Sequence, residues 1–331
     1  AVSFVVMAVS AGLAAAIPHA WTVAPPMPAT ENKPAPPNAT WRLHCLIPAV
    51  IGLLLSVGYG RWQLATPAAP ADAPTLSVAL IQSNFNTYFD YDPDRSRRTF
   101  EAYWRQTLAA VEANPDLDLI VWPESVYTDG LAEVRVAPDA ALPAEVPRER
   151  IDDHVAAFQE KTNQFAERIN RRWDKGQFRQ QGNTYALLGT ETVELSGDGQ
   201  QLFNTAMLVD PSGDVADRYY KMHPVILGEY IPLGRLLPVI YRLAPMAQGL
   251  TTGPAARAFH VRGVSLSPSI CFESSIPHLI RRQVRQLEQA GDGPDVLVNV
   301  THDGWFWGSA ILDFQLAGAV FRAVELRRPF L

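Results

Sequence analysis

The first part of the chain is apolar and almost uncharged. Residues 1–21 contain no Asp, Glu, Lys or Arg, and residues 43–60 form a second run of the same kind. About 20 apolar residues span the hydrocarbon core of a bilayer, with about 17 as a lower limit. These runs therefore predict membrane-spanning helices over 1–64, the first of them cut short at its start. A cleavable signal peptide for the first run, and buried helices of a soluble domain for both, are the alternatives.

Residues 65–75 consist mainly of Pro and Ala. This composition predicts a linker, which separates the region 1–64 from a second domain over 76–331. The sequence starts without methionine inside an apolar run and stops without a terminating signal. We therefore expect the membrane region to be truncated and the second domain to be incomplete at its C-terminal end.

Beyond the linker, strand and helix patterns alternate. Short apolar or alternating stretches predict strands at 76–81, 117–122, 184–190, 201–210, 214–220, 256–261, 264–270 and 295–300. Apolar residues at helical spacing predict helices at 95–111, 151–173, 275–289 and 311–326. Residues 232–250 form an apolar insertion whose only charges are two arginines. This alternation places the domain in the α/β class, with sheets covered by helices.

The composition excludes several kinds of protein. The formal net charge is −6, which argues against a nucleic-acid-binding surface. Cys45 and Cys271 are the only cysteines, so neither a disulfide framework nor a cysteine-based zinc site is expected. The seven histidines show no metal-binding spacing, and we expect no metal and no cofactor.

Three reactive side chains each follow a predicted strand: Glu124, Lys221 and Cys271. Side chains at strand ends converge on one rim in sheet-based enzymes, and ligands bind there. A carboxylate can act as a general base, an ammonium can stabilise an oxyanion, and a thiolate is a nucleophile. Cys271 is expected at a turn between strand and helix, where backbone N–H groups favour the thiolate. Taken singly, each residue has a simpler explanation: a buried apolar cysteine, a solvated acid and a surface lysine.

The sequences around the three residues favour the chemical interpretation. They read Trp-Pro-Glu-Ser around Glu124, Tyr-Tyr-Lys-Met-His-Pro around Lys221, and Ile-Cys-Phe-Glu around Cys271. In this order they closely resemble the three signature segments of the nitrilase superfamily. Within it, the chain is most similar to the apolipoprotein N-acyltransferases. The segments 228–232, 299–306 and 321–329 and the apolar runs upstream carry that closer resemblance, which covers about residues 43–331.

The resemblance implies a nitrilase-like αββα sandwich preceded by transmembrane helices, with Glu124, Lys221 and Cys271 as a catalytic triad. Glu229 would position or polarise the site, for example by pairing with Lys221. A further set would support it: Trp122, Tyr230, Phe272 and Glu273 lining or bracing the pocket, Asn299 closing a strand at the same rim, and Trp305 contacting lipid. Ordinary aromatic packing and a strand-end turn are the alternatives for this set.

The implied reaction is a two-step acyl transfer. Cys271 would attack an acyl ester of a membrane phospholipid, giving a thioester and a lysophospholipid. The amine of a diacylglyceryl-cysteine at a lipoprotein N-terminus would then take the acyl chain. Extracting such chains into water costs about 0.8 kcal/mol per CH₂, which favours an enzyme attached to the bilayer. The resemblance implies a multi-pass protein of the bacterial inner membrane with its catalytic domain on the periplasmic side, and we expect a monomer.

Two other functions remain open from the sequence. A membrane-tethered amidase or nitrilase would use the same three residues, with water as the second nucleophile. A non-catalytic membrane scaffold would keep the sandwich without its chemistry. The apolar insertion could contact lipid or could be a helical pair packed on the sandwich.

Overall fold

The structure is a computed structural model of the 331-residue chain. It describes residues 7, 9–10, 39–65, 72–83, 85, 94–138, 140, 146–174, 177–197, 199–226, 228–231, 249–306 and 308–331. The chain divides into two compact units, Ala1–Ala73 and Pro74–Leu331. Most of the predicted apolar insertion, residues 232–248, lies outside the described residues.

The first unit contains the helix α2, Ala39–Ala65. Large apolar side chains on this helix are exposed, among them Leu54, Leu55 and Leu64. The second predicted span, 43–60, lies inside α2, whereas the first lies almost wholly outside the described residues. Among the residues that the structure describes, no helix combines the length and the apolar character needed to cross a membrane.

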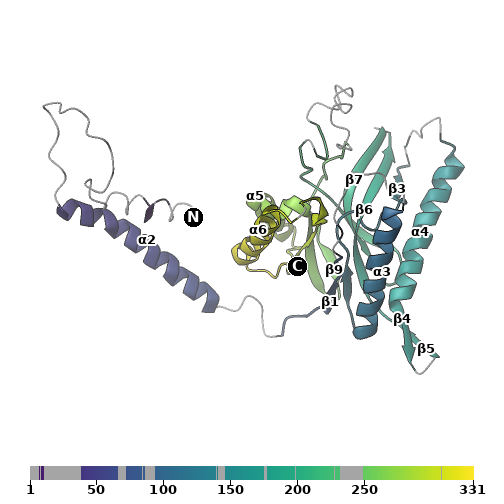
Figure 1. The fold of residues 1–331 in the computed structure, drawn as a ribbon, viewed down its shortest axis with the longest axis horizontal. Coiled ribbons are helices and arrows are strands. Elements are labelled where there is room, and N and C mark those ends of the chain that lie inside the picture. Colours follow the sequence, from purple (N-terminus) through teal and green to yellow (C-terminus); the bar gives the residue numbers. More distant parts are fainter. Residues whose placement is uncertain are drawn as a thin grey trace. The chain divides into compact units, whose positions relative to one another are not determined.

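The second unit is built on two sheets (Figure 1). The larger sheet runs in the order β1 (Val78–Leu80), β2 (Leu119–Val121), β6 (Tyr185–Ser196), β7 (Gly199–Val209) and β8 (Val215–Tyr220), and β3 (Glu133–Val136) also pairs with β6. The smaller sheet runs β11 (Val296–Val300), β10 (Val264–Ile270) and β9 (Phe259–Val261). A separate hairpin joins β4 (Arg171–Asp174) and β5 (Gln177–Gln181).

The helices cover the outer faces of these sheets. On the larger sheet lie α3 (Arg95–Ala113) and α4 (Arg148–Asn170), and on the smaller sheet lie α5 (Pro277–Gln289) and α6 (Ile311–Leu326) (Figure 1). One core fills the space between the larger sheet and its helices. A second core joins the two sheets, for example Leu187 and Leu208 against Leu266 and Val298. The result is the four-layer αββα sandwich that the resemblance predicts.

Most predicted elements are present, and two differences concern β3 and β4. The predicted helix 311–326 matches α6, whereas the predicted helix 151–173 ends at Asn170 and continues as β4. The strand β3 lies between the predicted strand at 117–122 and the predicted helix at 151–173, where the sequence pattern indicates neither strand nor helix. It pairs with residues 192–195 of β6, beyond the predicted end of that strand at 190. The pairing of β3 depends on a partner distant in the sequence and leaves only a weak local pattern, whereas β4 pairs with the adjacent β5.

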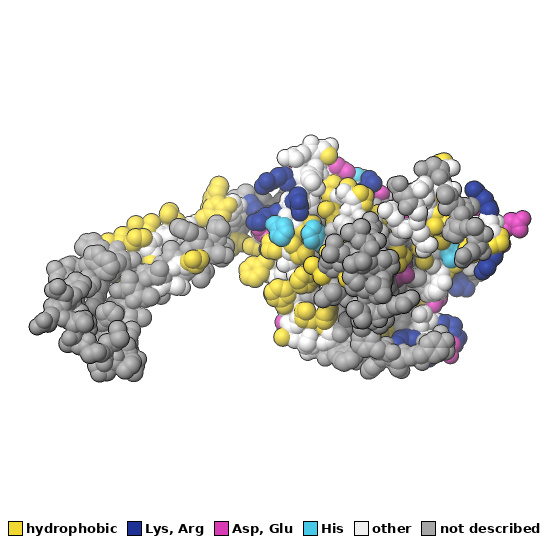
Figure 2. Space-filling model, turned by 90° about the horizontal axis from the view of Figure 1, so that it is seen from above, with side chains coloured by type: hydrophobic (Ala, Val, Ile, Leu, Met, Phe, Trp, Pro, Cys, Tyr) yellow, Lys and Arg dark blue, Asp and Glu magenta, His cyan; other side chains and the backbone are white. Residues whose placement is uncertain are grey.

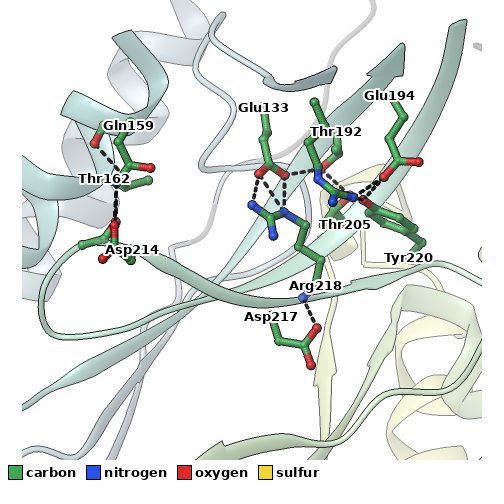
Figure 3. Close-up of polar contacts among 12 residues, drawn as sticks. Glu133, Gln159, Thr162, Thr192, Glu194, Thr205, Asp214, Asp217, Arg218 and Tyr220 are labelled. Carbon is green, nitrogen blue, oxygen red and sulfur yellow. Dashed lines mark hydrogen bonds and ion pairs between the residues drawn. The ribbon is translucent and has the colours of Figure 1, made fainter. Parts of the chain in front are cut away.

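A buried cluster of polar side chains connects β3 to β6 and β8 through hydrogen bonds. Glu133 is 4% exposed and accepts hydrogen bonds from Arg218 Nε at 2.7 and 2.9 Å, while a second guanidinium nitrogen also donates to it. Thr192 donates its hydroxyl to Glu133 Oε2 at 2.9 Å, and Thr205 donates to Thr192. Figure 3 shows the carboxylate facing the guanidinium with Thr192 beside it. We call these four residues the Glu133 cluster.

Candidate functional site

Cys271 lies directly after the buried strand β10. All residues of β10 are buried, and a short 3₁₀ turn, η3 (Cys271–Ser275), begins at the cysteine. The backbone φ of Cys271 is +54°, in the left-handed region that non-glycine residues seldom adopt. Asn299 of β11 donates from Nδ2 to the carbonyl oxygen of Cys271 at 2.9 Å. Cys271 is 8% exposed as a whole residue, at a turn that its neighbours hold in a strained conformation.

Glu273 holds this turn against the segment that follows Lys221. Its carboxylate is fully buried and accepts four hydrogen bonds. One oxygen accepts from the backbone N–H groups of Met222 and His223 at 2.7 and 2.9 Å. The other accepts from the Ile270 N–H and the Tyr219 hydroxyl, both at 2.8 Å. Glu273 therefore ties the nucleophile turn to the lysine segment, which fits the bracing role expected of it.

Lys221 follows β8 directly and is 1% exposed. Its ammonium lies 3.1 Å from Glu124 Oε1 and 2.7 Å from Glu229 Oε1. The second oxygen of Glu229 accepts from the Val225 N–H at 2.7 Å, which fixes that carboxylate. Gly253 permits this packing, because a Cβ there would lie 2.1 Å from the Tyr220 carbonyl oxygen. The pairing of Glu229 with Lys221 that the resemblance suggested is present.

Glu124 stands in the loop after β2 and is 7% exposed. Asn204, in the middle of β7, donates from Nδ2 to Glu124 Oε1 at 2.7 Å. The backbone N–H of His302 donates to the other oxygen at 3.4 Å. Gly189 lets the loop approach β6, since a Cβ there would lie 2.1 Å from the Pro123 carbonyl oxygen. The carboxylate is thus held from two sides while it contacts Lys221.

The charges of Glu124, Lys221 and Glu229 affect the pKa of the Cys271 thiol. Burial and the Glu124 carboxylate raise the pKa of Cys271 well above its ordinary value, and this outweighs Lys221 and a hydrogen bond with Thr301, which lower it. For Lys221, burial lowers the pKa, but Glu124, Cys271 and Glu229 raise it above its ordinary value. The cysteine is therefore a thiol at rest, and the lysine is an ammonium ion. The expectation that the turn would favour a resting thiolate is wrong, because burial beside a carboxylate dominates.

The structure brings Glu124, Lys221, Glu229 and Cys271 together, and we call them the thiol cluster. An acid that can accept a proton and an ammonium that can stabilise an anion beside a thiol are suited to nucleophilic catalysis. Within the described part of the chain, no three His, Cys, Asp or Glu side chains lie close enough together to hold a metal ion.

The other residues predicted to support the site lie in different parts of the second unit. Trp122 is fully buried, donates to the Thr107 hydroxyl at 2.9 Å and packs among aromatic residues beneath α3 and α4. It therefore belongs to the outer core and does not line the pocket. Phe272 packs against the core between the sheets, and Tyr230 is half-buried near the start of the insertion. The side chain of Trp305 lies outside the described residues.

Sequence reasoning missed two contacts of the cluster. Asn204 lies inside a strand, where no strand-end signal marks it, although a polar residue in the buried half of β7 is a weak hint. Thr301 stands just beyond β11, binds the thiol and donates to Asp303 Oδ1 at 2.7 Å. Both act by orienting other side chains, which the sequence does not reveal.

Known proteins resemble this chain in sequence. A model of the carbon-nitrogen hydrolase family matches residues 77–331. The apolipoprotein N-acyltransferase of Rhodopirellula baltica is 27% identical over 343 residues, covering 100% of this chain and 58% of that protein. The apolipoprotein N-acyltransferase of Geobacter metallireducens is 31% identical over 298 residues, covering 90% and 48%. The chain spans about half the length of these relatives.

Solved structures also resemble it, at low sequence identity. Nit3 of Saccharomyces cerevisiae, a member of branch 10 of the nitrilase superfamily, matches with a TM-score of 0.45 and 15% identity over 76% of this chain and 73% of that one. An amidase from Nesterenkonia sp. matches with a TM-score of 0.41 and 16% identity over 74% and 72%. The superfamily resemblance predicted from three short segments is confirmed by the family match over residues 77–331. The chain belongs to the carbon-nitrogen hydrolase family.

Proposed function

We propose that this chain transfers an acyl chain from a phospholipid, through a thioester on Cys271, to the N-terminal amine of a diacylglyceryl-cysteine lipoprotein. The observation that carries the proposal is the thiol cluster, in which one buried thiol is flanked by a paired acid and ammonium. The names of the similar proteins support the choice of acyl transfer within the family.

In the first step, Glu124 takes the thiol proton as the Cys271 sulfur attacks the ester carbonyl. A base is required because burial keeps the thiol protonated at rest. The ammonium of Lys221 has three N–H groups, of which two are directed to Glu124 and Glu229, so the third is available for the oxyanion. When the ester C–O bond breaks, Glu124 returns the proton to the departing lysophospholipid oxygen.

In the second step, the lipoprotein amine attacks the thioester carbonyl. Glu124 takes a proton from the amine, the C–S bond breaks, and the proton returns to the sulfur. Lys221 stabilises the second oxyanion from the same position. Exclusion of water from so buried a thiol would protect the thioester from hydrolysis.

The substrates also require contact with a membrane. Both carry long acyl chains, which an enzyme in water would have to extract from lipid. We propose that residues 1–64 attach the chain to the bacterial inner membrane and that 76–331 form the catalytic domain on its periplasmic side. The exposed apolar side chains of α2 support attachment to lipid. The insertion 232–250 would add a further apolar surface.

The test is transfer of a radiolabelled acyl chain from phospholipid vesicles to a synthetic peptide whose N-terminal cysteine carries diacylglycerol. The proposal predicts labelled peptide and an equal amount of lysophospholipid. The chain offers a matched pair of variants, because Cys45 is its other cysteine. Cys271→Ala should abolish transfer, whereas Cys45→Ala should retain it.

Transfer by the Cys271→Ala protein would refute the mechanism. Release of ammonia from small amides, with no label on lipid products, would instead support hydrolysis by the same cluster. A protein that does neither would favour a scaffold.

A further inference from the structure

A cavity of about 880 Å³ lies between α6 and the two sheets of the second unit. It begins beside the thiol cluster: Pro123 precedes Glu124, Ser274 belongs to the turn of Cys271, and Thr301 hydrogen-bonds the thiol. We call it the α6 cavity. Its volume is within the range of about 300–1,000 Å³ that is usual for ligand pockets.

The two ends of the α6 cavity differ in polarity. Near the nucleophile the wall is polar, with Ser274, Asn299 and Thr301. Farther away, Leu312, Leu316 and Ala319 line it from successive turns of one face of α6, where Gln315 is the polar lining residue. Leu80 and Phe85 complete this end and are themselves 55% and 40% exposed. A cavity that is polar at the thiol and apolar beyond it matches an ester joined to a hydrocarbon chain.

The apolar end continues onto the molecular surface. Leu316 is more than half exposed, and so are four further large side chains of α6, namely Phe314, Val320, Phe321 and Val324. Figure 2 shows hydrophobic side chains gathered at the end of the compact unit where α5 and α6 lie. Exposed apolar surface of this kind usually marks a binding site. A chain entering from lipid would therefore meet apolar surface until it reaches the polar wall beside the nucleophile.

We propose that the α6 cavity binds the hydrocarbon chain of the acyl donor and so sets which chain lengths Cys271 accepts. This inference rests on the proposed function, and it adds the substrate feature that is recognised and the residues that recognise it. Each CH₂ buried in the cavity changes the equilibrium in favour of binding by roughly fourfold. Filling the apolar end should therefore penalise long chains much more than short ones.

The test uses p-nitrophenyl esters of acetate, octanoate and palmitate with the detergent-solubilised full chain. The Cys271 sulfur bonds to the acyl carbon, the ester C–O bond breaks and p-nitrophenolate leaves, so its initial burst measures acylation. In Ala319→Trp, palmitate acylation should fall by roughly tenfold or more, while acetate acylation changes by less than about twofold. Leu316→Trp, at an exposed position on the rim, should act in the same direction and tolerates the larger side chain more easily.

The control is Ala317→Trp, because Ala317 is exposed on the same helix and does not line the α6 cavity. It should leave the ratio of palmitate to acetate acylation unchanged. An unchanged ratio in both Ala319→Trp and Leu316→Trp would overturn the proposal even if acylation itself is normal.

A second readout needs no chemistry. The Cys271→Ala protein should bind the fluorescent fatty acid cis-parinaric acid, and adding Ala319→Trp should weaken that binding by roughly tenfold. If no ester acylates the protein but this binding and its loss are observed, the proposed reaction fails and the cavity assignment stands. If binding is absent, or is unaffected by the tryptophan, the cavity assignment fails by itself.

Discussion

Two buried glutamates, Glu124 and Glu133, each contact a cation in the same unit, but their surroundings differ. Glu133 receives the fork of the Arg218 guanidinium on both oxygens together with the Thr192 hydroxyl (Figure 3). Glu124 receives one ammonium, which Glu229 shares, and lies close enough to the Cys271 thiol to raise its pKa.

The difference separates a structural ion pair from a reactive one. An arginine stays charged at any pH that a protein experiences, and its planar fork satisfies a carboxylate completely. The Glu133 cluster therefore has one arrangement of protons. In the thiol cluster, one ammonium faces two carboxylates and a thiol. The thiol proton can therefore move from the Cys271 sulfur to the Glu124 carboxylate while Lys221 stabilises the oxyanion of the substrate. The partners of a buried carboxylate, more than its burial, therefore decide whether it can act as a base.

Glu124→Gln should have the largest effect on chemistry. The amide keeps the size of the side chain and an oxygen for the Asn204 donor, but it cannot take the thiol proton. Formation of the acyl-enzyme should fall by about 10²–10⁴-fold, with little change in thermal stability. Rapid-quench measurement of labelled acyl-enzyme checks this, and a near-normal rate would remove Glu124 from the role of base.

Glu133→Gln should lower the stability of the fold and leave the acylation rate almost unchanged. It leaves the Arg218 guanidinium without its carboxylate partner in a mostly buried place, which costs about 3 kcal/mol. Urea unfolding should show that loss, while acylation per folded molecule stays close to normal. If this variant instead reacted slowly at full stability, the distinction between the two glutamates would be lost.

Glu273→Gln should have a smaller effect on both the acylation rate and the free energy of unfolding. Its amide group would face N–H donors where the carboxylate accepts four hydrogen bonds, and an unsatisfied buried group costs about 1–3 kcal/mol. Because these bonds hold the Cys271 turn, the acylation rate at saturating ester should fall while KM changes little.

The matched control for that variant is Tyr219→Phe, which removes one donor and leaves the three backbone donors to Glu273 in place. It should acylate at nearly the normal rate. Equal losses in the two variants would mean that Glu273 does not position the turn through the backbone.

The smallest effect is on stability at high pH. The pKa of Cys271 is raised above its ordinary 9.0 in the folded chain, so above about pH 9 the unfolded chain releases a proton that the folded chain keeps. Folding stability should therefore fall as the pH rises, by at most about 1.4 kcal/mol per pH unit from this group. Lys221 adds to the loss only above its ordinary 10.5, because its folded pKa is also raised. Cys271→Ala should flatten the curve of melting temperature against pH between these values, and an unchanged slope would contradict the assigned thiol.

The sequence predicted the parts of the fold that depend on local pattern. Buried strands such as β10 and the helix α6 are visible as continuous or periodic apolar residues, and their alternation indicates the layers. The proximity of Glu124, Lys221 and Cys271 was predictable because each follows a strand and strand ends meet at one rim. The signature segments around them added the order and the family.

The features that the sequence did not predict depend on how deeply a side chain is buried and on contacts with residues distant in the sequence. The resting state of Cys271 follows from how deeply the turn is buried beside Glu124, and no local pattern encodes that depth. Asn204 is a site contact only because β7 lies beside the loop after β2. Trp122 continues the alternation of β2 and faces the outer core with Ile120, whereas Glu124, two residues on, lies in the loop after the strand, where the alternation no longer sets its direction.

An acyl group bound to Cys271 would be direct evidence that this residue is the nucleophile. The full chain is incubated with phospholipid vesicles without an acceptor, quenched in acid and digested, and its peptides are examined by mass spectrometry. We expect one acyl chain on the peptide containing Cys271, released by hydroxylamine at neutral pH as a thioester. An acyl chain found on another residue, or none on Cys271 in a protein that still transfers acyl chains, would contradict it.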